Sequence, residues 1–151
     1  MELSHLNTHG KLQMVDVGNK PPMVRRATAA GSITLQPQTI QKICNGVVVK
    51  GDVLAAARMA GIMGAKKTSE VIPLCHPLYI EHIDVEASVR SDGVEVLAKV
   101  RSTGATGVEM EALTAVSVAL LTIYDMCKAI DKQMVIRDIV LLEKTKEEVN
   151  K

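Results

Sequence analysis

The sequence predicts an α+β fold in which helices cover one face of an antiparallel sheet. Residues 83–100 alternate between apolar and polar side chains on both sides of Ser91-Asp92-Gly93, a pattern typical of a β-hairpin. The stretch 103–131 opens with two glycines and then continues without Gly or Pro, which predicts one long helix. The middle of this helix is apolar on every face, so we expect other elements to cover it on more than one side.

Composition favours one soluble domain and excludes several classes of function. The chain has 151 residues, 47% of them hydrophobic, and contains two Tyr but no Phe or Trp. Eighteen basic and seventeen acidic residues nearly cancel, and aromatic residues for base stacking are scarce, so we expect no nucleic-acid and no membrane partner. The three cysteines lack metal-ligand or disulfide spacing, and residues 1–13 contain no apolar run of the kind expected in a secretory signal. We therefore expect a cytoplasmic protein without disulfides.

The first half of the chain divides into an arm, a strand and two helices. Residues 1–22 are rich in polar residues, Gly and Pro and predict a flexible N-terminal arm, in which the β-prone segment 14–17 could lie on a neighbouring surface. Residues 24–35 favour a strand. Pro37 begins a short helix that ends near Asn45 with Gly46 as its C-cap. Asp52 is placed to cap an alanine-rich, slim helix over residues 53–67.

The second half adds the hairpin, the long helix and a last strand. Prolines within residues 69–80 predict an extended segment before the hairpin. After the long helix, residues 134–144 favour a strand, and the charged tail 145–151 is expected to fray. The resulting order, βαββαβ, is the ferredoxin-like plan, here as a single domain over residues 23–144. The long helix is also too short and too rich in hydroxyl groups to be expected to span a bilayer.

Charged residues gather at the two ends of the long helix. Glu109 and Glu111 lie at its start, whereas Asp125 and Lys128 lie at its finish. At about 1.5 Å per residue, Glu111 and Asp125 are roughly 21 Å apart. One small substrate cannot touch both ends of the same helix, so a shared pocket would need a second subunit. Glu109 and Glu111 are roughly 200° apart around the helix axis, which predicts that at most one faces a given site.

Several polar residues have both a structural and a chemical interpretation. Asp125 and Lys128 are neighbours on one helical face, either as a surface ion pair or as a proton-transfer pair. Lys50 follows a valine run that could end a buried strand, or it is an ordinary loop lysine. His76 lies between prolines and could serve as a general acid, a phosphate contact or a core residue.

Metal and phosphate sites are only weakly indicated by local sequence. Cys75 has no further Cys or His at ligand spacing, so no zinc site is expected. The glycines Gly104 and Gly107 enclose too short a loop to form a P-loop. Three basic residues are candidate triphosphate contacts, although each could equally be solvated charge: Arg25, Lys66 and Lys67.

Four long motifs resemble one known family. They are MVDV (14–17), KGDVLAAARMAGIMGAKKTS (50–69), IPLCHPL (72–78) and TGVEMEALTAVSVALLTIYDMCKA (106–129). They resemble the MoaC family of cyclic pyranopterin monophosphate synthases, lyases of molybdenum cofactor biosynthesis, and the likeness extends from residue 5 to residue 142. The resemblance implies conversion of 3′,8-cyclo-7,8-dihydro-GTP, supplied by a radical-SAM GTP cyclase, to cyclic pyranopterin monophosphate and pyrophosphate. It also implies a hexamer built as a trimer of dimers, with active sites between subunits and no cofactor.

The same resemblance assigns roles to residues of this chain. Asp125 matches the family's designated active-site aspartate, and Lys128 and Lys50 match lysines of the same catalytic set. Other positions match the substrate pocket, Lys66 less closely than the rest: Leu74, Cys75, His76, Met110, Glu111, Glu109, Arg25 and Lys66. The family's lysine- and glycine-rich tail is replaced here by KTKEEVNK (144–151), in which only Lys144 matches.

These roles suggest acid–base chemistry without a redox step. Mutual repulsion would lower the pKa of one lysine, while Asp125 would orient the other and hold it charged. Lys50 and Lys128 would then move protons, and His76, Arg25 and Lys66 would hold the triphosphate. Two other interpretations remain: a non-catalytic oligomer that binds a purine nucleotide as a sensor or scaffold, and a hydrolase subunit with Cys75 as nucleophile.

Overall fold

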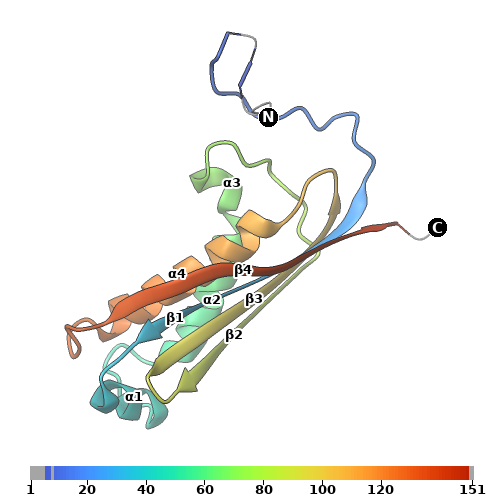
Figure 1. Cartoon of the computed structure of the whole chain (residues 1–151). Helices are drawn as coiled ribbons and strands as arrows, with labels where there is room; N and C mark the ends of the chain where they lie inside the picture. Colours follow the sequence, from blue (N-terminus) through green and yellow to red (C-terminus); the bar gives the residue numbers. More distant parts are fainter. Residues whose placement is uncertain (1–5, 8, 150–151) are drawn as a thin grey trace.

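A four-stranded antiparallel sheet forms the centre of the molecule, as the computed structural model of residues 6–7 and 9–149 shows (Figure 1). The strands lie in the order β2-β3-β1-β4. Successive strands of the sheet pair antiparallel. This order and the helices on one face confirm the predicted ferredoxin-like α+β fold. The strands are β1 (Met23–Thr34), β2 (His82–Arg90), β3 (Gly93–Gly104) and β4 (Val135–Glu148).

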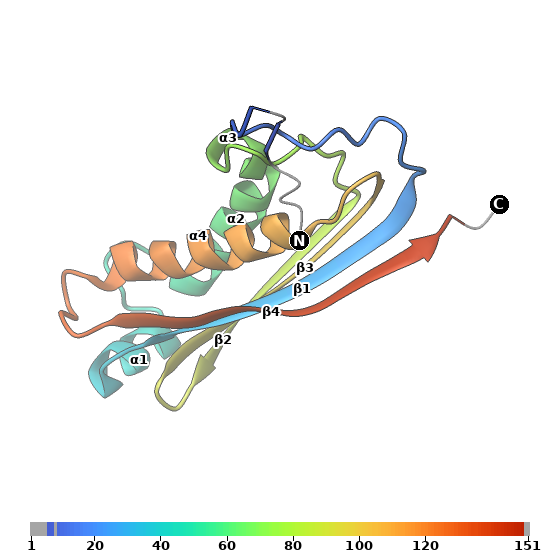
Figure 2. The ribbon, with the colours of Figure 1, turned by 45° about the horizontal axis from the view of Figure 1, so that its top comes forward.

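Helices α2 and α4 run side by side over one face of the sheet (Figure 2). The four helices of the described residues are α1 (Pro37–Cys44), α2 (Val53–Lys66), α3 (Thr68–Val71) and α4 (Glu109–Cys127). A Cβ added at Gly61 would lie 3.0 Å from the Ala115 carbonyl oxygen, and one added at Gly64 would lie 2.8 Å from Val118. The small residues of α2 therefore allow the close helix packing that the sequence predicts.

Helix α4 is the central element of the core. Its buried residues include Ala112, Ala115, Val116, Leu120 and Ile123, which pack between the sheet and α2. By length and composition alone α4 could cross a membrane, so the sequence argument from its length was wrong. In the structure, one face of α4 packs against the sheet and α2, as a core helix does.

Three local predictions need correction. The extended segment expected from residue 69 begins later, because α3 occupies Thr68–Val71 and Pro73 restricts only the residue before it, Ile72. The last strand does not end at residue 144: β4 continues through Glu148, which pairs with Met23 of β1. The tail was expected to fray from residue 145, but this pairing holds it in the sheet up to Glu148. Residues 150–151 lie outside the described part of the chain.

The valine run before Lys50 is not the end of a strand. Residues 47–50 form a loop and a turn, and Val49 is 99% exposed. Asp52 caps α2 as predicted, since its carboxylate accepts the backbone N–H of Ala55 at 2.9 Å. Gly46 adopts a φ of 65° directly after the Asn45 cap of α1, the left-handed conformation that ends many helices.

Candidate active site

The three predicted catalytic residues meet at the C-terminal end of α4. The Lys128 Nζ lies 2.6 Å from one carboxylate oxygen of Asp125, and the Lys50 Nζ lies 2.7 Å from the other. Lys50 also donates to the main-chain carbonyl of Asp125 at 2.9 Å. The aspartate is thus held between two ammonium groups, one from its own helix and one from the loop after α1.

These contacts set the protonation states of the cluster. Hydrogen bonds from Lys128 and then Lys50, reinforced by their charges, lower the pKa of Asp125 to about 2. The same carboxylate raises the pKa of Lys128 above its ordinary value. The Asp125 side chain is 55% exposed, so solvent reaches the group. At neutral pH the cluster therefore presents the Lys128 ammonium as a proton donor beside an ionised carboxylate.

A buried aspartate anchors the turn that follows this cluster. Asp131 accepts the backbone N–H of Gln36 at 2.8 Å and that of Gln133 at 3.0 Å. Burial alone would raise the pKa of Asp131, but these backbone hydrogen bonds reverse the effect and lower it. The anchored turn ties the chain after α4 to the start of α1.

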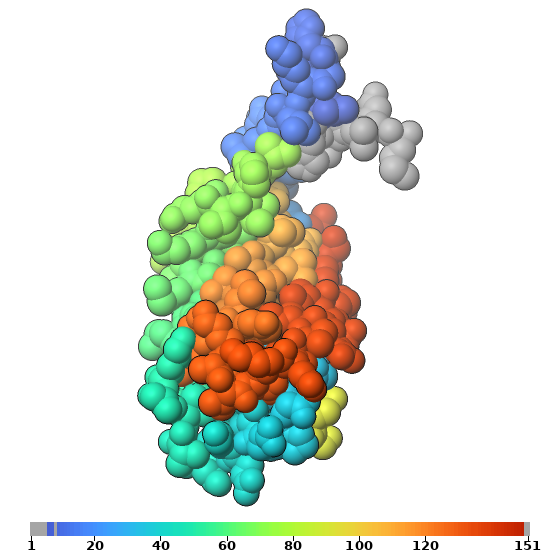
Figure 3. Space-filling view, turned by 90° about the vertical axis from the view of Figure 1, so that its left-hand side faces the viewer, coloured from blue at the N-terminus to red at the C-terminus, as the bar shows by residue number. Residues whose placement is uncertain are grey.

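Six of the eight predicted substrate-binding residues line a cavity at the opposite end of α4. Its volume is about 700 Å³, and the N-terminal arm, the 72–78 segment, the β3–α4 loop, the start of α4 and β4 enclose it. In Figure 3 the light-green 72–78 segment lies beside the blue arm at the top of the molecule, far from the cyan α1. The cavity contains these predicted residues: Leu74, Cys75, His76, Glu109, Met110 and Glu111.

Stiff backbone positions His76 in this cavity. Pro73 and Pro77 each disfavour the helical conformation for the residue before them, which is Ile72 for the first and His76 itself for the second. The imidazole Nε2 lies 2.7 Å from the main-chain carbonyl of Val15, which belongs to the arm. His76 therefore links its own segment to the N-terminal arm, which is far away in sequence.

Both predicted glutamates face the cavity, so the expectation that at most one would do so was wrong. The cavity lies over the end of the helix rather than beside it, and residues at different angles around the axis reach it there. Glu111 is only 3% exposed, and burial, with a smaller contribution from Glu109, raises its pKa. Burial, with Glu111 nearby, also raises the pKa of the Cys75 thiol. The raised pKa argues against Cys75 as a nucleophile.

Arg25 borders a smaller adjoining cavity of about 250 Å³. The two cavities share Gly107, Glu109 and Lys144 in their walls. Arg25 donates to the Ala105 carbonyl at 3.3 Å, whereas its buried Nε has no hydrogen-bond partner among the described residues. A buried guanidinium nitrogen without a partner is a donor that an anionic ligand could satisfy.

Lys144 joins the site from β4. Its Nζ lies 3.1 Å from a carboxylate oxygen of Glu109. A Cβ at Gly107 would overlap that carboxylate, so the glycine leaves the space in which the ion pair forms. Sequence reasoning noted Lys144 only as a remnant of the family tail. It missed Lys20 of the arm, which also lines the larger cavity, because a lone lysine in a polar arm carries no local signal.

Lys66 is not brought to the main cavity. It is exposed and lines a separate hollow together with residues 78–83, and that hollow shares only Leu78 with the larger cavity. Lys67 pairs with Glu70 at 3.7 Å on the surface. The triphosphate role that the sequence suggested for Lys66 therefore has no support within one protomer.

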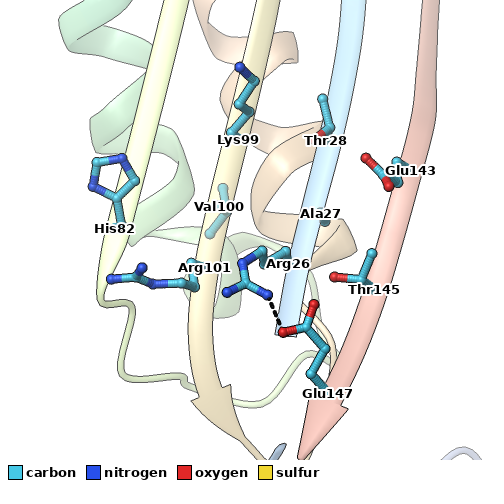
Figure 4. A pocket seen from close by; sticks show the side chains of 10 residues that line it. All are labelled: Arg26, Ala27, Thr28, His82, Lys99, Val100, Arg101, Glu143, Thr145 and Glu147. Carbon is cyan, nitrogen blue, oxygen red and sulfur yellow. Dashed lines mark hydrogen bonds and ion pairs between the residues drawn. The ribbon is translucent and has the colours of Figure 1, made fainter. Parts of the chain in front are cut away.

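Another cavity, of about 450 Å³, lies on the face of the sheet that the helices leave open (Figure 4). Arg26 and Glu147 form an ion pair of 2.8 Å there, and Arg101 pairs with Glu81 at 3.2 Å. None of the predicted site residues lines this cavity. Within residues 6–7 and 9–149, no group of His, Cys, Asp or Glu is arranged to hold a metal ion.

The fold and the two ends of α4 define a class: a ferredoxin-like α+β protein with a lysine–aspartate–lysine cluster at one end of α4 and a cavity with charged and apolar walls at the other. Comparison with known proteins agrees with this class. The MoaC family model matches residues 14–147, and the chain belongs to the MoaC family.

Close relatives cover almost the whole chain. A cyclic pyranopterin monophosphate synthase of Peptoclostridium acidaminophilum is 53% identical over 96% of this chain and 92% of its own length. The synthase of Desulfitobacterium hafniense is 56% identical, over 96% and 90%. The synthase of Chloroflexus aggregans is 57% identical, over 95% and 88%.

Proposed function

We propose that this chain catalyses the reaction for which its relatives are named, the formation of cyclic pyranopterin monophosphate in molybdenum cofactor biosynthesis. The substrate is 3′,8-cyclo-7,8-dihydro-GTP, and pyrophosphate is the second product. The observation that carries the proposal is the large cavity lined by His76, Glu111 and Lys144, beside the half-buried Arg25, whose Nε has no hydrogen-bond partner in the described part of the chain. The family membership supplies the reaction class.

The substrate's triphosphate fits the basic side of the two joined cavities. Arg25 and Lys144 lie on their walls, and Lys20 closes the larger cavity from the arm. Phosphate oxygens accept hydrogen bonds from guanidinium and ammonium groups, which would also stabilise the leaving pyrophosphate. We assign these three residues to triphosphate binding. His76 is left out of the set because its Nε2 already bonds to the Val15 carbonyl, and Lys66 is left out because it lies at a separate hollow.

The Lys50–Asp125–Lys128 cluster supplies the acid–base chemistry. The reaction moves protons at ring and ribose positions and then joins a hydroxyl group to the innermost phosphate, without a change of redox state. Lys128 is held as an ammonium by Asp125, so it enters the reaction as a proton donor. Lys50, bonded to the same carboxylate, completes a set through which protons can pass. Asp125 orients both amines.

A second protomer would complete the site. Roughly 21 Å of helix separates Glu111 from Asp125, so the proton donors of one chain cannot reach a ligand in its own cavity. Large apolar side chains are exposed on the outer surfaces of α4 and β4: Leu121, Tyr124, Val140 and Leu142. Burial of these side chains between copies would favour association. We infer that the chain works as a homo-oligomer, a hexamer built as a trimer of dimers, in which the acid–base cluster of one protomer faces the cavity of another.

The test is direct. Purified protein is mixed with 3′,8-cyclo-7,8-dihydro-GTP, and pyrophosphate and cyclic pyranopterin monophosphate are measured together. Release of both products in equal amounts is expected. Tight binding without pyrophosphate release would instead support a nucleotide sensor, and loss of activity on thiol alkylation would reopen a role for Cys75. Substrate supply by a radical-SAM GTP cyclase in the cytoplasm completes the proposal.

A further inference from the structure

The N-terminal arm takes part in the larger cavity through residues 15–17, which we call the strap. Val15 and Val17 are half-buried and line the cavity, whereas Asp16 between them is exposed. This alternation is that of an extended segment lying with one face on a surface. Asp16 accepts the backbone N–H of Gly18 at 2.8 Å, which turns the chain directly after the strap.

The strap bonds directly to His76. The carbonyl oxygen of Val15 lies 2.7 Å from the His76 Nε2. A carbonyl oxygen can only accept a hydrogen bond, so Nε2 carries the hydrogen. In the neutral ring this leaves Nδ1 as the acceptor. Because His76 lines the cavity and Nε2 is taken by the strap, Nδ1 is the nitrogen available to a ligand.

We propose that the strap is a positioning element of the active site: its Val15 carbonyl sets the tautomer and orientation of His76, and its valines form one wall of the substrate cavity. The strap therefore presents Nδ1 as an acceptor for a hydroxyl or N–H group of the substrate. A group that hydrogen-bonds one ring nitrogen of a histidine commonly determines which nitrogen carries the proton and which one binds a ligand. The consequence for catalysis rests on the proposed function, whereas the tautomer does not.

The test unseats the strap without changing the folded domain. The double variant Val15→Asp/Val17→Asp places two carboxylates where half-buried valines lie, close to Glu109 and Glu111, and should drive the strap off the surface. The matched control is Met14→Asp, which adds a charge at the exposed position just before the strap. A chain lacking residues 2–17 provides a second way to remove the strap.

Two readouts are used. In ¹⁵N-histidine-labelled protein, the His76 signal is identified by its loss in His76→Gln. It should show a protonated Nε2 in the unmodified chain and in Met14→Asp, and a mixture of tautomers in both strap variants. Since small displacements of a positioned group cost up to about 100-fold in rate, kcat/KM should fall about 10- to 100-fold in the strap variants alone.

The outcomes separate the two proposals. An unchanged His76 tautomer together with unchanged kcat/KM in both strap variants would overturn the role of the strap. A protonated Nδ1 in the unmodified chain would overturn it as well. If the unmodified chain released no pyrophosphate, the proposed function would fail, yet the nitrogen signals would still decide whether the strap sets the tautomer.

Discussion

Lys50 holds Asp125 by two atoms at once, its Nζ lying 2.7 Å from the carboxylate and 2.9 Å from the main-chain carbonyl of the same residue. The carbonyl is among those at the end of α4 that lack a partner within the helix. Lys50 therefore both caps the helix and fixes the aspartate. Lys50 is far from Asp125 in sequence. Its Nζ nevertheless lies about as close to the Asp125 carboxylate as that of Lys128, which is only three residues away.

Removal of either amine should abolish most activity and spare the fold. General acid–base groups contribute about 10² to 10⁴ in rate, so Lys50→Ala and Lys128→Ala should lower kcat by at least that order. Both side chains are about half exposed, so thermal unfolding should change little. Lys42→Ala, an exposed change in the last turn of α1, is the matched control. Near-normal turnover in both lysine variants would remove them from the mechanism.

The titration of Asp125 should report its two lysine partners. The carboxylate has a pKa of about 2, well below its ordinary value of 3.8, chiefly because Lys128 donates to it. A lowered pKa means that the folded state binds fewer protons, so the contribution of this group to stability is present above about pH 4 and is lost as pH falls toward 2. Carboxyl ¹³C NMR should show the midpoint near 2 in the unmodified chain.

Lys128→Met gives the contrast for that titration. With its first hydrogen-bond donor removed, Asp125 should titrate closer to the ordinary value of 3.8. High salt should shift the unmodified chain in the same direction, because the exposed cluster is screened. A midpoint that stays near 2 in Lys128→Met would show that another group, and not Lys128, holds the carboxylate ionised.

Regular patterns in the sequence were sufficient to predict the fold. The period-two alternation over residues 83–100 predicted the hairpin, and the uninterrupted apolar stretch after Gly107 predicted α4. The short helix α3 was missed because four residues before a proline carry no periodic signal. The far end of β4 was missed because charged residues suggested a loose tail, although backbone pairing with β1 holds them in the sheet.

Only part of the candidate site could be predicted without the structure. The ion pair of Asp125 and Lys128 followed from helical spacing, and the structure shows it at 2.6 Å. Lys50 was noted for the valine run before it, but its place in the catalytic set came from the family resemblance, since no local pattern links a loop lysine to a helix end. The contacts of Lys144 with Glu109 and of Val15 with His76 join segments far apart in the chain. Only the three-dimensional arrangement of the sheet and the arm reveals them.

Gly107→Ala should damage the cavity without unfolding the protein. The added methyl group would overlap the Glu109 carboxylate, a flexible group that can move only by leaving Lys144. We expect kcat/KM to fall about tenfold or more. The free energy of unfolding should change by less than about 1 kcal/mol, because Lys144, one partner of the lost ion pair, is 66% exposed. Gly104→Ala is the matched control, since its methyl group would meet only Ser102 Oγ, at 3.8 Å. Equal activity in the two variants would contradict the role of Gly107.

Glu111→Gln should stabilise the protein more as pH rises. Burial raises the pKa of Glu111, so the folded state favours the protonated form, and ionisation costs stability above the unfolded value of about 4.5. The neutral amide avoids this cost. Urea unfolding at pH 4 and pH 7.5 should show a stability gain for the variant that is larger at pH 7.5. A gain that is equal or smaller at pH 7.5 would show that the carboxylate is satisfied when charged.

Subunit mixing tests whether one active site uses both ends of α4. His76→Ala removes a cavity residue and Lys128→Ala removes a proton donor, so each variant alone should be nearly inactive. If each site takes its cavity from one protomer and its amines from the partner, a mixed pair carries both defects in one site and none in the other. Denaturing and refolding the variants together in equal amounts should therefore restore up to about a quarter of the unmodified activity. The control is the same mixture combined without denaturation, in which subunits keep their original partners. If refolded mixtures stay as inactive as the separate variants, although mass spectrometry shows mixed oligomers, each protomer must build its site alone. The distance along α4 makes that outcome hard to reconcile with a single small substrate.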